Sequence, residues 1–470
     1  IVMGWVINAM ASVVSVMLNM DKWTAVWLCV IIALVYAILS GFWGVVITDL
    51  VQFVIAMFGS ISLAIIALNY VGGMESLLEK LSYLVDTGIA HENTIRFIPP
   101  IPDQSIAEIS FWESPFSKFL IFISIMWWSH HGTDGGGYII QRMSSAKNEK
   151  HALLATLWFN LAHYALRVWP WIIVSVVSIV LFPIIPEAYS ELGTKAGYPL
   201  VMNSLLGPGM KGILIVSFLA AFMSTIDTHL NWGASYLIND IYKRFFKPEA
   251  SEKHYVLVGK ILTIILMVLA AFTSLKMQSI SKAWEFIFSM GAGIGLVLIL
   301  RWFWWRINAW TEITALSVSI ITTTTLEVIA AYQTIASGSN YTLFGNAPVL
   351  FGISLQIHHK LLIIVPLSII SWLIMTFITD PEPDEKLEEF YKRIQPGGWW
   401  GPITKNFQHT MQPVSDGFLI QWISGALMIY GFTFGIGNLI FINYSSSILC
   451  FGCAAIGSYL VWNRGISKLG

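Results

Sequence analysis

Long apolar runs repeat along this sequence, and they constrain its fold more than any other feature. A helix needs about 20 mostly apolar residues to cross the roughly 30 Å hydrocarbon core of a bilayer. Runs of about that length lie near residues 1–18, 23–40, 43–71, 116–131, 150–182, 210–239, 255–275, 284–303, 311–335, 360–379, 417–442 and 446–463. Only 11% of the residues are charged, against roughly 25% in a soluble domain. We therefore predict an all-α, polytopic membrane protein with about twelve transmembrane helices.

The distribution of charge predicts the orientation of these helices. Lys and Arg are concentrated in one set of alternate connections, and the positive-inside rule places that set, with the C-terminus, in the cytoplasm. A net charge of -1 without a basic patch argues against a nucleic-acid partner. The chain opens with Ile1-Val2-Met3-Gly4-Trp5, already apolar and without an initiator Met or a basic region. This start predicts a chain that begins inside a transmembrane helix of a longer protein.

The stretch 219–231 lies inside the sixth apolar run and is too polar to face lipid. Ser224, Thr225, Asp227 and Thr228 fall within a turn and a half of helix, so their oxygens can converge. An unpaired carboxylate at mid-bilayer would cost roughly 2.5–3.5 kcal/mol, which predicts a bound cation. Hard oxygen ligands suit an alkali cation better than a transition metal. Alternatively, the hydroxyls bond to carbonyls one turn earlier and Asp227 faces a water-filled seam.

The fourth apolar run leads into three consecutive glycines at 135–137, which predict an interrupted helix because each glycine disfavours helix by about 1 kcal/mol. Irregular backbone at membrane depth is tolerated where it is buried or lines a cavity, and transporters build substrate sites there. Stacking faces and hydrogen-bonding groups gather at this point, namely Trp127, Trp128, His130, His131 and Asp134. Alternatively, this is a surface loop with the two tryptophans as interfacial anchors.

Two further interpretations concern the polar side chains of neighbouring segments. A metal site at His130, His131 and Asp134 is disfavoured, because successive side chains on a helix diverge by about 100° and no His pair has i, i+4 spacing. Asn160, His163, Tyr164 and Arg167 form a stripe that predicts a helix face turned to a cavity or a partner helix. Arg167 could instead be a structural counter-ion. Pro170 should kink this helix.

Asp49 offers a possible second cation site. It lies near the cytoplasmic end of the third run, at the level where the sixth run places Asp227 and Thr228. The alternative is that Asp49 caps its helix together with Thr48.

Four ordered motifs resemble those of the sodium/solute symporter family. They are Gly-Phe-Trp-Gly-Val-Val-Ile-Thr-Asp-Leu-Val-Gln at 41–52, Tyr-Ile-Ile-Gln-Arg-Met-Ser-Ser-Ala-Lys at 138–147, Ala-Ala-Phe-Met-Ser-Thr at 220–225 and Asn-Asp-Ile-Tyr-Lys at 239–243. The resemblance covers roughly residues 1–305. Members of this family are sodium-coupled carriers of sugars, proline, sialic acid, vitamins and iodide.

The resemblance implies a transporter fold of two inverted repeats of five helices with extra flanking helices. Residues 1–71 would then hold the end of core helix 3 with core helices 4 and 5, and 116–305 would hold core helices 6–10. Core helices 1 and 2 would be missing. An extracellular loop at 72–115, additional transmembrane helices at 306–379, a cytoplasmic linker at 380–416 and a C-terminal transmembrane pair at 417–470 complete the expected organisation.

The resemblance also implies site residues. The main sodium would bind the carbonyl of Ala221 and the hydroxyls of Ser224 and Thr225. A second sodium, or a proton, would bind at Asp49, Ser224, Asp227 and Thr228. Members with two sodium ions carry hydroxyls at both positions that correspond to Asp227 and Thr228, so Asp227 departs from their pattern. His163 falls where sugar carriers place a polar substrate contact.

The function expected from the resemblance is secondary active transport, not enzymatic catalysis. Sodium would be the coupling ion for the symport of a small polar solute, sugar-like or amino-acid-like, across the cell membrane by alternating access. Two alternatives stay open from the residues alone. One is a sensor that has kept the fold and lost transport, and the other is an intramembrane metalloenzyme that uses His130, His131 and Asp134.

Overall fold

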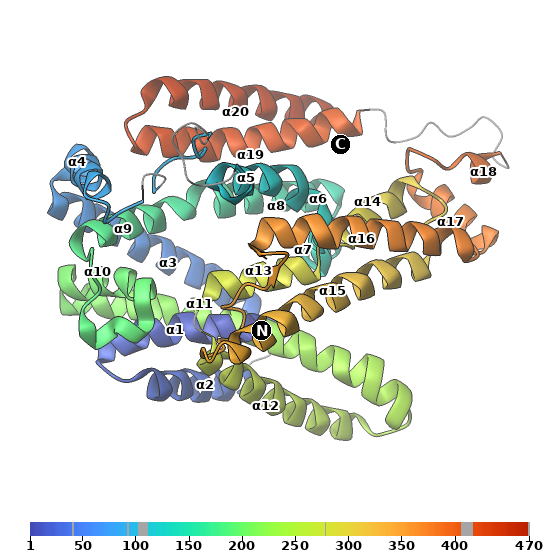
Figure 1. The fold of residues 1–470 in the computed structure, drawn as a ribbon. Coiled ribbons are helices and arrows are strands. Elements are labelled where there is room, and N and C mark those ends of the chain that lie inside the picture. Colours follow the sequence, from blue (N-terminus) through green and yellow to red (C-terminus); the bar gives the residue numbers. More distant parts are fainter. Residues whose placement is uncertain (40–41, 92–93, 102–110, 278, 406–416, 469–470) are drawn as a thin grey trace. The chain divides into compact units, whose positions relative to one another are not determined.

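A computed structural model describes residues 1–39, 42–91, 94–101, 111–277, 279–405 and 417–468, of which 38–39, 42–50, 138, 141 and 468 are described by their backbone alone. Helices make up almost all of it, as the sequence predicts (Figure 1). The regular strands in these residues are β1 (Val349–Leu350) and β2 (Ile353–Ser354), which pair as a short antiparallel hairpin. The chain divides into two compact units: 1–94 with 167–283, and 95–166 with 284–470.

Within the described residues, eight helices are long and apolar enough to cross a membrane. They are Val51–Val71, Glu149–Leu181, Pro208–Phe246, Glu252–Lys276, Ala309–Ala336, Ile357–Ile378, Phe418–Ile440 and Tyr444–Arg464. Two bent pairs, Val2–Leu18 with Lys22–Ala37 and Ile280–Met290 with Gly295–Phe303, raise the number to ten if each is one span. This is fewer than the twelve expected.

Two local features account for the lower number. The first two predicted helices bend by 115° at a break after residue 18, where Asn19 adopts a left-handed conformation and ends the first helix. The predicted span at 116–131 is helical only to Ser129, in consecutive pieces of 7, 5 and 3 residues, which is too short to cross the bilayer.

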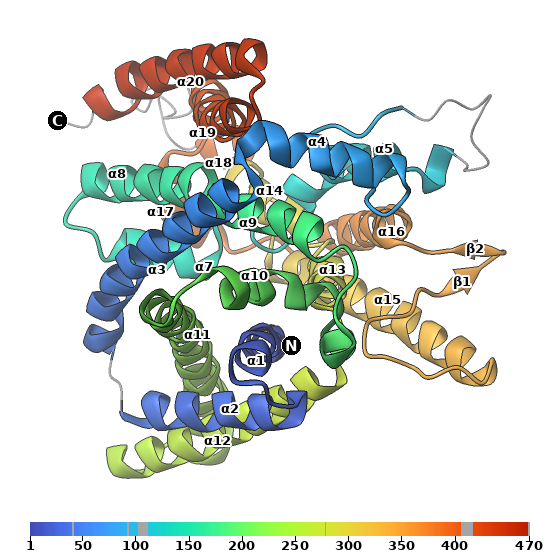
Figure 2. The ribbon, with the colours of Figure 1, turned by 90° about the vertical axis from the view of Figure 1, so that its left-hand side faces the viewer.

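In the first unit, four helices pack around α1. Its elements are α1 (Val2–Leu18), α2 (Lys22–Leu39), α3 (Phe42–Val71), α4 (Gly73–Asp86), α9 (Val168–Leu181), the 3₁₀ segment η4 (Glu187–Ala196), α10 (Gly197–Leu205), α11 (Pro208–Tyr236), the π-helical η5 (Leu237–Phe246) and α12 (Glu252–Lys276). Helices α2, α10, α11 and α12 lie around α1, which Figure 2 views nearly end-on. Fully buried Ile7, Ile226 and Met267 bring α1, α11 and α12 into one core.

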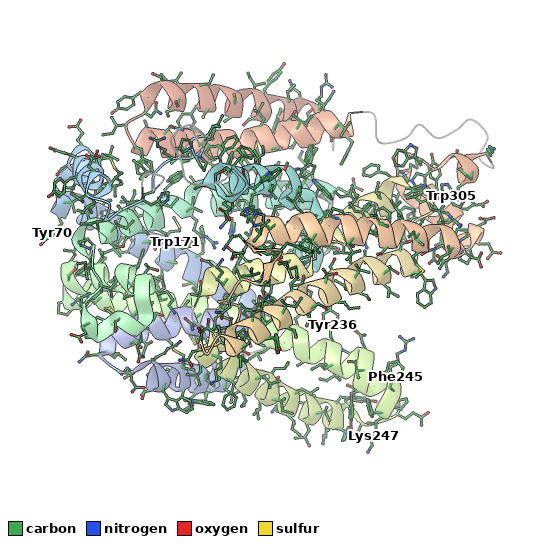
Figure 3. The ribbon with its side chains drawn as sticks, viewed as in Figure 1. Tyr70, Trp171, Tyr236, Phe245, Lys247 and Trp305 are labelled. Carbon is green, nitrogen blue, oxygen red and sulfur yellow. The ribbon has the colours of Figure 1, made fainter. Side chains whose placement is uncertain are left out.

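Two other contacts hold this unit together away from α1. Helix α4 occupies part of the connection that the sequence assigns to an extracellular loop, and it buries Leu77 and Leu81 on one face. Helix α3 is joined to α9 by Trp171, labelled in Figure 3. Its Nε1 donates a 3.0 Å hydrogen bond to Ser60 Oγ. These contacts position α3 against α9 and α11.

The C-terminal end of α12 is capped by side chains from α1 and α2, and a lysine of η4 supports the cap. Asn8 donates from Nδ2 to the carbonyls of Ser274 (2.9 Å) and Met277 (2.8 Å), and Lys22 Nζ donates to Met277 (3.2 Å). Lys195 Nζ in turn donates to Asn8 Oδ1 at 3.1 Å. Cations and amide donors stabilise a helix C-terminus because its last carbonyls have no partner within the helix.

Lys195 should give this cap a measurable pH dependence. Burial, with a smaller contribution from the charge of Lys22, lowers the pKa of Lys195 from 10.5 to about 8. Between pH 8 and 10.5 the unfolded chain therefore holds a proton that the folded chain has released, so stability should rise with pH across this window. We expect the melting temperature of the wild type to rise relative to that of Lys195→Met between pH 8 and 10. Parallel curves for the two proteins would assign the titration to another group.

The second unit contains the two interrupted helices. Its elements begin with the 3₁₀ segment η1 (Phe111–Glu113), α5 (Pro115–Ile121), the π-helical η2 (Phe122–Met126), α6 (Trp127–Ser129), α7 (Gly136–Ser144), α8 (Glu149–Asn160) and the π-helical η3 (Leu161–Leu166). They continue with α13 (Ile280–Met290), which begins in the first unit, α14 (Gly295–Phe303), α15 (Ala309–Ala336), α16 (Ile357–Ile378), α17 (Asp384–Ile394), α18 (Gly401–Thr404), α19 (Phe418–Ile440), α20 (Tyr444–Arg464) and the 3₁₀ segment η6 (Ile466–Lys468).

Helices α13 and α14 are bent by 41° at a glycine-rich link. Gly293 in this link lies so close to the buried Ser319 of α15 and Ser368 of α16 that a Cβ there would overlap both hydroxyls. The two serines also donate to one carbonyl, that of Ala315, at 2.9 and 3.1 Å. Glycine is therefore required for the link to approach the α15–α16 pair.

The predicted cytoplasmic linker is partly folded onto the end of α14. Trp399 N donates to the carbonyl of Phe303 at 2.6 Å, and Trp400 Nε1 donates to that of Trp302 at 3.1 Å. Trp305, labelled in Figure 3, packs with Trp400 in a cluster with residues of α17 and α18. The residues 406–416 of this linker lie outside the described part of the chain.

The predicted C-terminal helix pair forms a closely packed hairpin of α19 and α20. Gly431 of α19 lies against the backbone of Cys450 and Ala454, and Gly457 of α20 lies against the backbone of Ser424 and Met428. A Cβ at either glycine would come within 2.6–2.8 Å of those backbone atoms. Small residues thus allow the two helix backbones to approach each other.

Candidate functional site

The polar residues of α11 lie on the side of the helix opposite its core contacts. Phe222, Ile226 and Leu230 are buried in the core of the first unit, among residues of α1, α2 and α12. Each residue turns the helix by about 100°, so Ala221, Ser224, Thr225 and Thr228 share the opposite side. Ser224, Thr225 and Thr228 are partly buried and Ala221 is exposed. A single helix face therefore carries the three residues predicted for the main sodium.

The hydroxyl of Thr225 and the carbonyl of Ala221 are in direct contact. Thr225 Oγ1 donates to Ala221 O at 2.9 Å, which is the bond to the preceding turn that the sequence allowed as an alternative. This bond does not exclude a cation, because a hydroxyl oxygen and a carbonyl oxygen each have two lone pairs. It fixes the Thr225 rotamer and holds two hard oxygen donors side by side, a donor set suited to an alkali cation.

Asp227 is buried on the same helix. Only 1% of its surface is exposed, and its Oδ1 accepts a 3.0 Å hydrogen bond from Asn231 Nδ2. Sequence reasoning missed Asn231, although its i, i+4 spacing from Asp227 is a local signal. Asp49, the predicted partner for a second cation, lies on α3 with its side chain outside the described residues.

The predicted helix interruption at 129–137 is present. Helix α6 ends at Ser129, His130 has an extended backbone, and α7 begins at Gly136, which has a positive φ of 67°. His130 Nδ1 accepts a 2.9 Å hydrogen bond from the backbone N–H of Gly132, so a neutral His130 carries its proton on Nε2. A positive φ is strained for residues other than glycine, which explains why glycine stands where α7 begins.

The predicted solute residues at this break make contacts with different elements. Trp127 is 49% exposed and contacts Trp422 of α19, with ring centroids 5.1 Å apart. Trp128 donates its Nε1 to Ser124 O in its own helix, at 2.7 Å. His130 lies edge-on to Phe288 of α13. The described contacts therefore do not gather these side chains around one common space.

The remaining predicted solute residues are also engaged with neighbours. His131 lies close to Gly291 in the α13–α14 link, where a Cβ would overlap its ring. His163, on the π-helical η3, stacks on Phe159 with ring centroids 5.1 Å apart. The irregular η3 ends four residues before Pro170, whose missing N–H is consistent with the predicted distortion of this helix.

Asp134 is held at the break by hydrogen bonds to both of its carboxylate oxygens. Its Oδ1 accepts from the backbone N–H of Gly136 at 2.9 Å, and its Oδ2 accepts from Arg301 Nη2 of α14 at 2.8 Å. Arg301 Nη1 also lies 3.6 Å from Glu312 Oε1 of α15. Sequence reasoning missed Arg301, because nothing local in the sequence connects residues 134 and 301.

A metal centre at the break receives no support from these contacts. No group of three or more His, Cys, Asp or Glu side chains in the described part of the chain could hold a metal ion. Asp134 is instead engaged by Arg301 and Gly136.

Comparisons with known proteins place these observations in a family context. The family model described as "Sodium:solute symporter family" matches residues 3–321. The chain is 26% identical to sodium/glucose cotransporter 1 of Oryctolagus cuniculus over 63% of this chain and 48% of that protein. It is also 26% identical to the osmoregulated proline transporter OpuE of Bacillus subtilis (strain 168), over 64% of this chain and 56% of that protein. The chain thus spans about half the length of these relatives.

A solved structure has a similar fold. The structure described as a substrate-bound outward-open state of a Na⁺-coupled sialic acid symporter matches with a TM-score of 0.52 at 16% sequence identity. The match covers 81% of this chain and 72% of that chain. The predicted transporter fold is thereby confirmed.

Proposed function

We propose a function from one premise: this chain belongs to the sodium:solute symporter family, whose model matches residues 3–321. The protein is a multi-pass membrane transporter that uses sodium to drive the uptake of a small polar organic solute. The family and the matched relatives are transporters and not enzymes. The cell membrane is its proposed location, with the C-terminus in the cytoplasm.

The observation that carries this proposal is the polar face of α11. Ala221 O and Thr225 Oγ1 are in contact, and Ser224 shares their side of the helix. We assign these three residues to the main sodium. When bound, the ion would be held by the attraction between its positive charge and these oxygens, and its gradient would supply the energy for transport. The residues of this chain hold the oxygens in place, and the core contacts of Phe222 and Ile226 fix the rotation of α11.

The energy available from sodium is sufficient for accumulation. One sodium ion that crosses a potential of 100 mV releases roughly 2.3 kcal/mol, and a tenfold gradient adds about 1.4 kcal/mol. Together these support an accumulation of several hundred-fold. Sodium binding favours the outward-open state, and its release inward is followed by release of the solute.

The proposed solute is sugar-like or amino-acid-like. The names of the relatives include glucose, proline and myo-inositol. At the break, neutral His130 presents an Nε2–H donor, which suits a hydroxyl or carboxylate oxygen of such a solute. Trp127, Trp128, His131, Asp134 and His163 remain in the proposed solute region, although Asp134 acts there through the contacts described above and not as a free carboxylate.

Uptake in proteoliposomes tests the proposed function. The full-length protein should accumulate at least one labelled probe among D-glucose, L-proline, myo-inositol and sialic acid when an inward sodium gradient is present. An equal gradient of potassium or choline is the control. Equal uptake with the three cations would contradict sodium coupling, and sodium-dependent binding without counterflow would indicate the sensor alternative.

A second cation at Asp49, Ser224, Asp227 and Thr228 is a separate proposal. Two carboxylates that share a site repel each other, so a bound cation or a proton should be needed to hold both of them there. Wild-type uptake should then show a Hill coefficient above one for sodium and competition by protons at low pH. Asp227→Asn should lower the coefficient towards one and weaken proton competition. Wild-type cooperativity in this variant would make Asp227 a structural acid that is held by Asn231.

A further inference from the structure

Helix α14 contacts the α6–α7 break at two separate points. At its start, Gly295 lies against the carbonyl oxygens of Trp128 and His130, so closely that a Cβ there would overlap both. Near its end, Arg301 binds Asp134. Residues 295 and 301 are about 9 Å apart along a helix axis, at 1.5 Å per residue. One rigid helix thus holds both sides of the turn 130–135.

The two oxygens of Asp134 have different roles in this arrangement. Oδ1 accepts from Gly136 N and so caps the start of α7, while Oδ2 accepts from Arg301. The Asp134 side chain is only 12% exposed and that of Arg301 is 35% exposed. A charged hydrogen bond that is partly shielded from water is worth more than a surface ion pair. The 3.6 Å pair of Arg301 with Glu312, whose side chain is 41% exposed, should contribute less.

We propose that Arg301 is a positioning residue for solute binding: by holding Asp134 it fixes the turn 130–135, and α14 moves together with the break during transport. This inference rests on the proposed function, since it assumes that the turn lies in the solute region. Arg301 acts through Asp134 and touches no solute itself. His130 and His131 are the side chains that it orients.

Uptake kinetics test the positioning role. We expect Arg301→Gln to raise the KM for the transported probe about tenfold or more, with a smaller change in maximal rate. Asp134→Asn keeps the Gly136 cap and loses the charge, so its KM should rise similarly. The double variant should be no worse than either single variant, because both remove one interaction. Arg301→Lys should recover part of the affinity, and Glu312→Gln, the matched control, should stay close to wild type. Additive losses in the double variant would overturn the proposal.

Histidine modification tests the turn without any transport. Diethyl pyrocarbonate should modify His130 and His131 several-fold faster in Arg301→Gln than in the wild type, as measured by peptide mass spectrometry in purified full-length protein. His163, which stacks on Phe159 in another helical segment, is the internal reference. Thermal melting in detergent identifies any variant that fails to fold. Unchanged rates at His130 and His131 in a folded variant would overturn the proposal even if sodium-driven uptake is confirmed. Faster modification in a protein that shows no sodium-driven uptake would support the positioning of the turn and contradict only the transport premise.

Discussion

Replacing Gly295 by alanine is expected to abolish the proposed sodium-driven uptake and to lower strongly the yield of folded protein. The new Cβ would meet the backbone carbon of Ser129 and the carbonyl oxygens of Trp128 and His130, the last at 2.6 Å. None of these atoms can rotate away as a flexible side chain does. Overpacking of a well-packed core costs typically 1–3 kcal/mol, and a backbone clash at the helix break should lie at the upper end.

Fluorescence-detected size-exclusion chromatography and a thermal melt would measure this effect. Gly452→Ala in α20 is the matched control, because a Cβ at residue 452 meets no atom within 4 Å. Alanine in a helix interior is favoured over glycine by about 1 kcal/mol, so this control should fold at least as well as the wild type. A folded, fully active Gly295→Ala protein would mean that α14 does not approach the break as closely as described.

Thr225→Ala should raise the sodium concentration for half-maximal uptake about tenfold or more. A hydrogen-bonding or ligand oxygen that faces a charge is worth about 1.5–3 kcal/mol, and each 1.4 kcal/mol is a factor of ten. The variant also loses the bond that places this oxygen beside Ala221 O. Solute affinity at saturating sodium should change much less, because the proposed role of Thr225 is confined to the ion.

Two companion variants separate the ion site from a general effect on the helix. Thr225→Ser keeps the hydroxyl and should retain nearly normal sodium dependence. Thr325→Ala on α15 removes a hydroxyl that makes the same type of bond, to Ile321 O at 2.8 Å, at an exposed position. It should leave sodium dependence unchanged. An unaltered sodium response in Thr225→Ala would remove Thr225 from the site.

The spans and the helix break could be predicted from the sequence because their causes are local. Apolar length identifies a transmembrane helix whatever it packs against, and consecutive glycines disfavour helix wherever they occur. The spacing of Ala221, Ser224 and Thr225 likewise fixes a shared face before any tertiary contact is known. The bend after residue 18 was harder to foresee, because it depends on one left-handed residue, Asn19.

The grouping of the solute residues could not be predicted in the same way. The residue types at the break show which side chains can stack or donate hydrogen bonds. The rotamers and partners of these side chains, however, are set by helices far away in the sequence. Trp127 turns to Trp422, and Asp134 turns to Arg301. Nothing local in the sequence distinguishes a free Asp134 from a paired one, because its counter-ion is 167 residues away. The role of Asp49 stays a prediction, since its side chain lies outside the described residues.

The close pairing of α19 and α20 has a consequence for biogenesis. Their contacts through Gly431 and Gly457 join residues that are near each other in the sequence, and small residues drive helix association in lipid, where the hydrophobic effect gives no help. The hairpin can therefore form as soon as both helices have left the translocon, before it docks on the helices made earlier. A bulky residue at position 431 should block formation of this hairpin. We expect the unpaired helices to be recognised by membrane quality control, whereas insertion of the earlier helices should be unaffected.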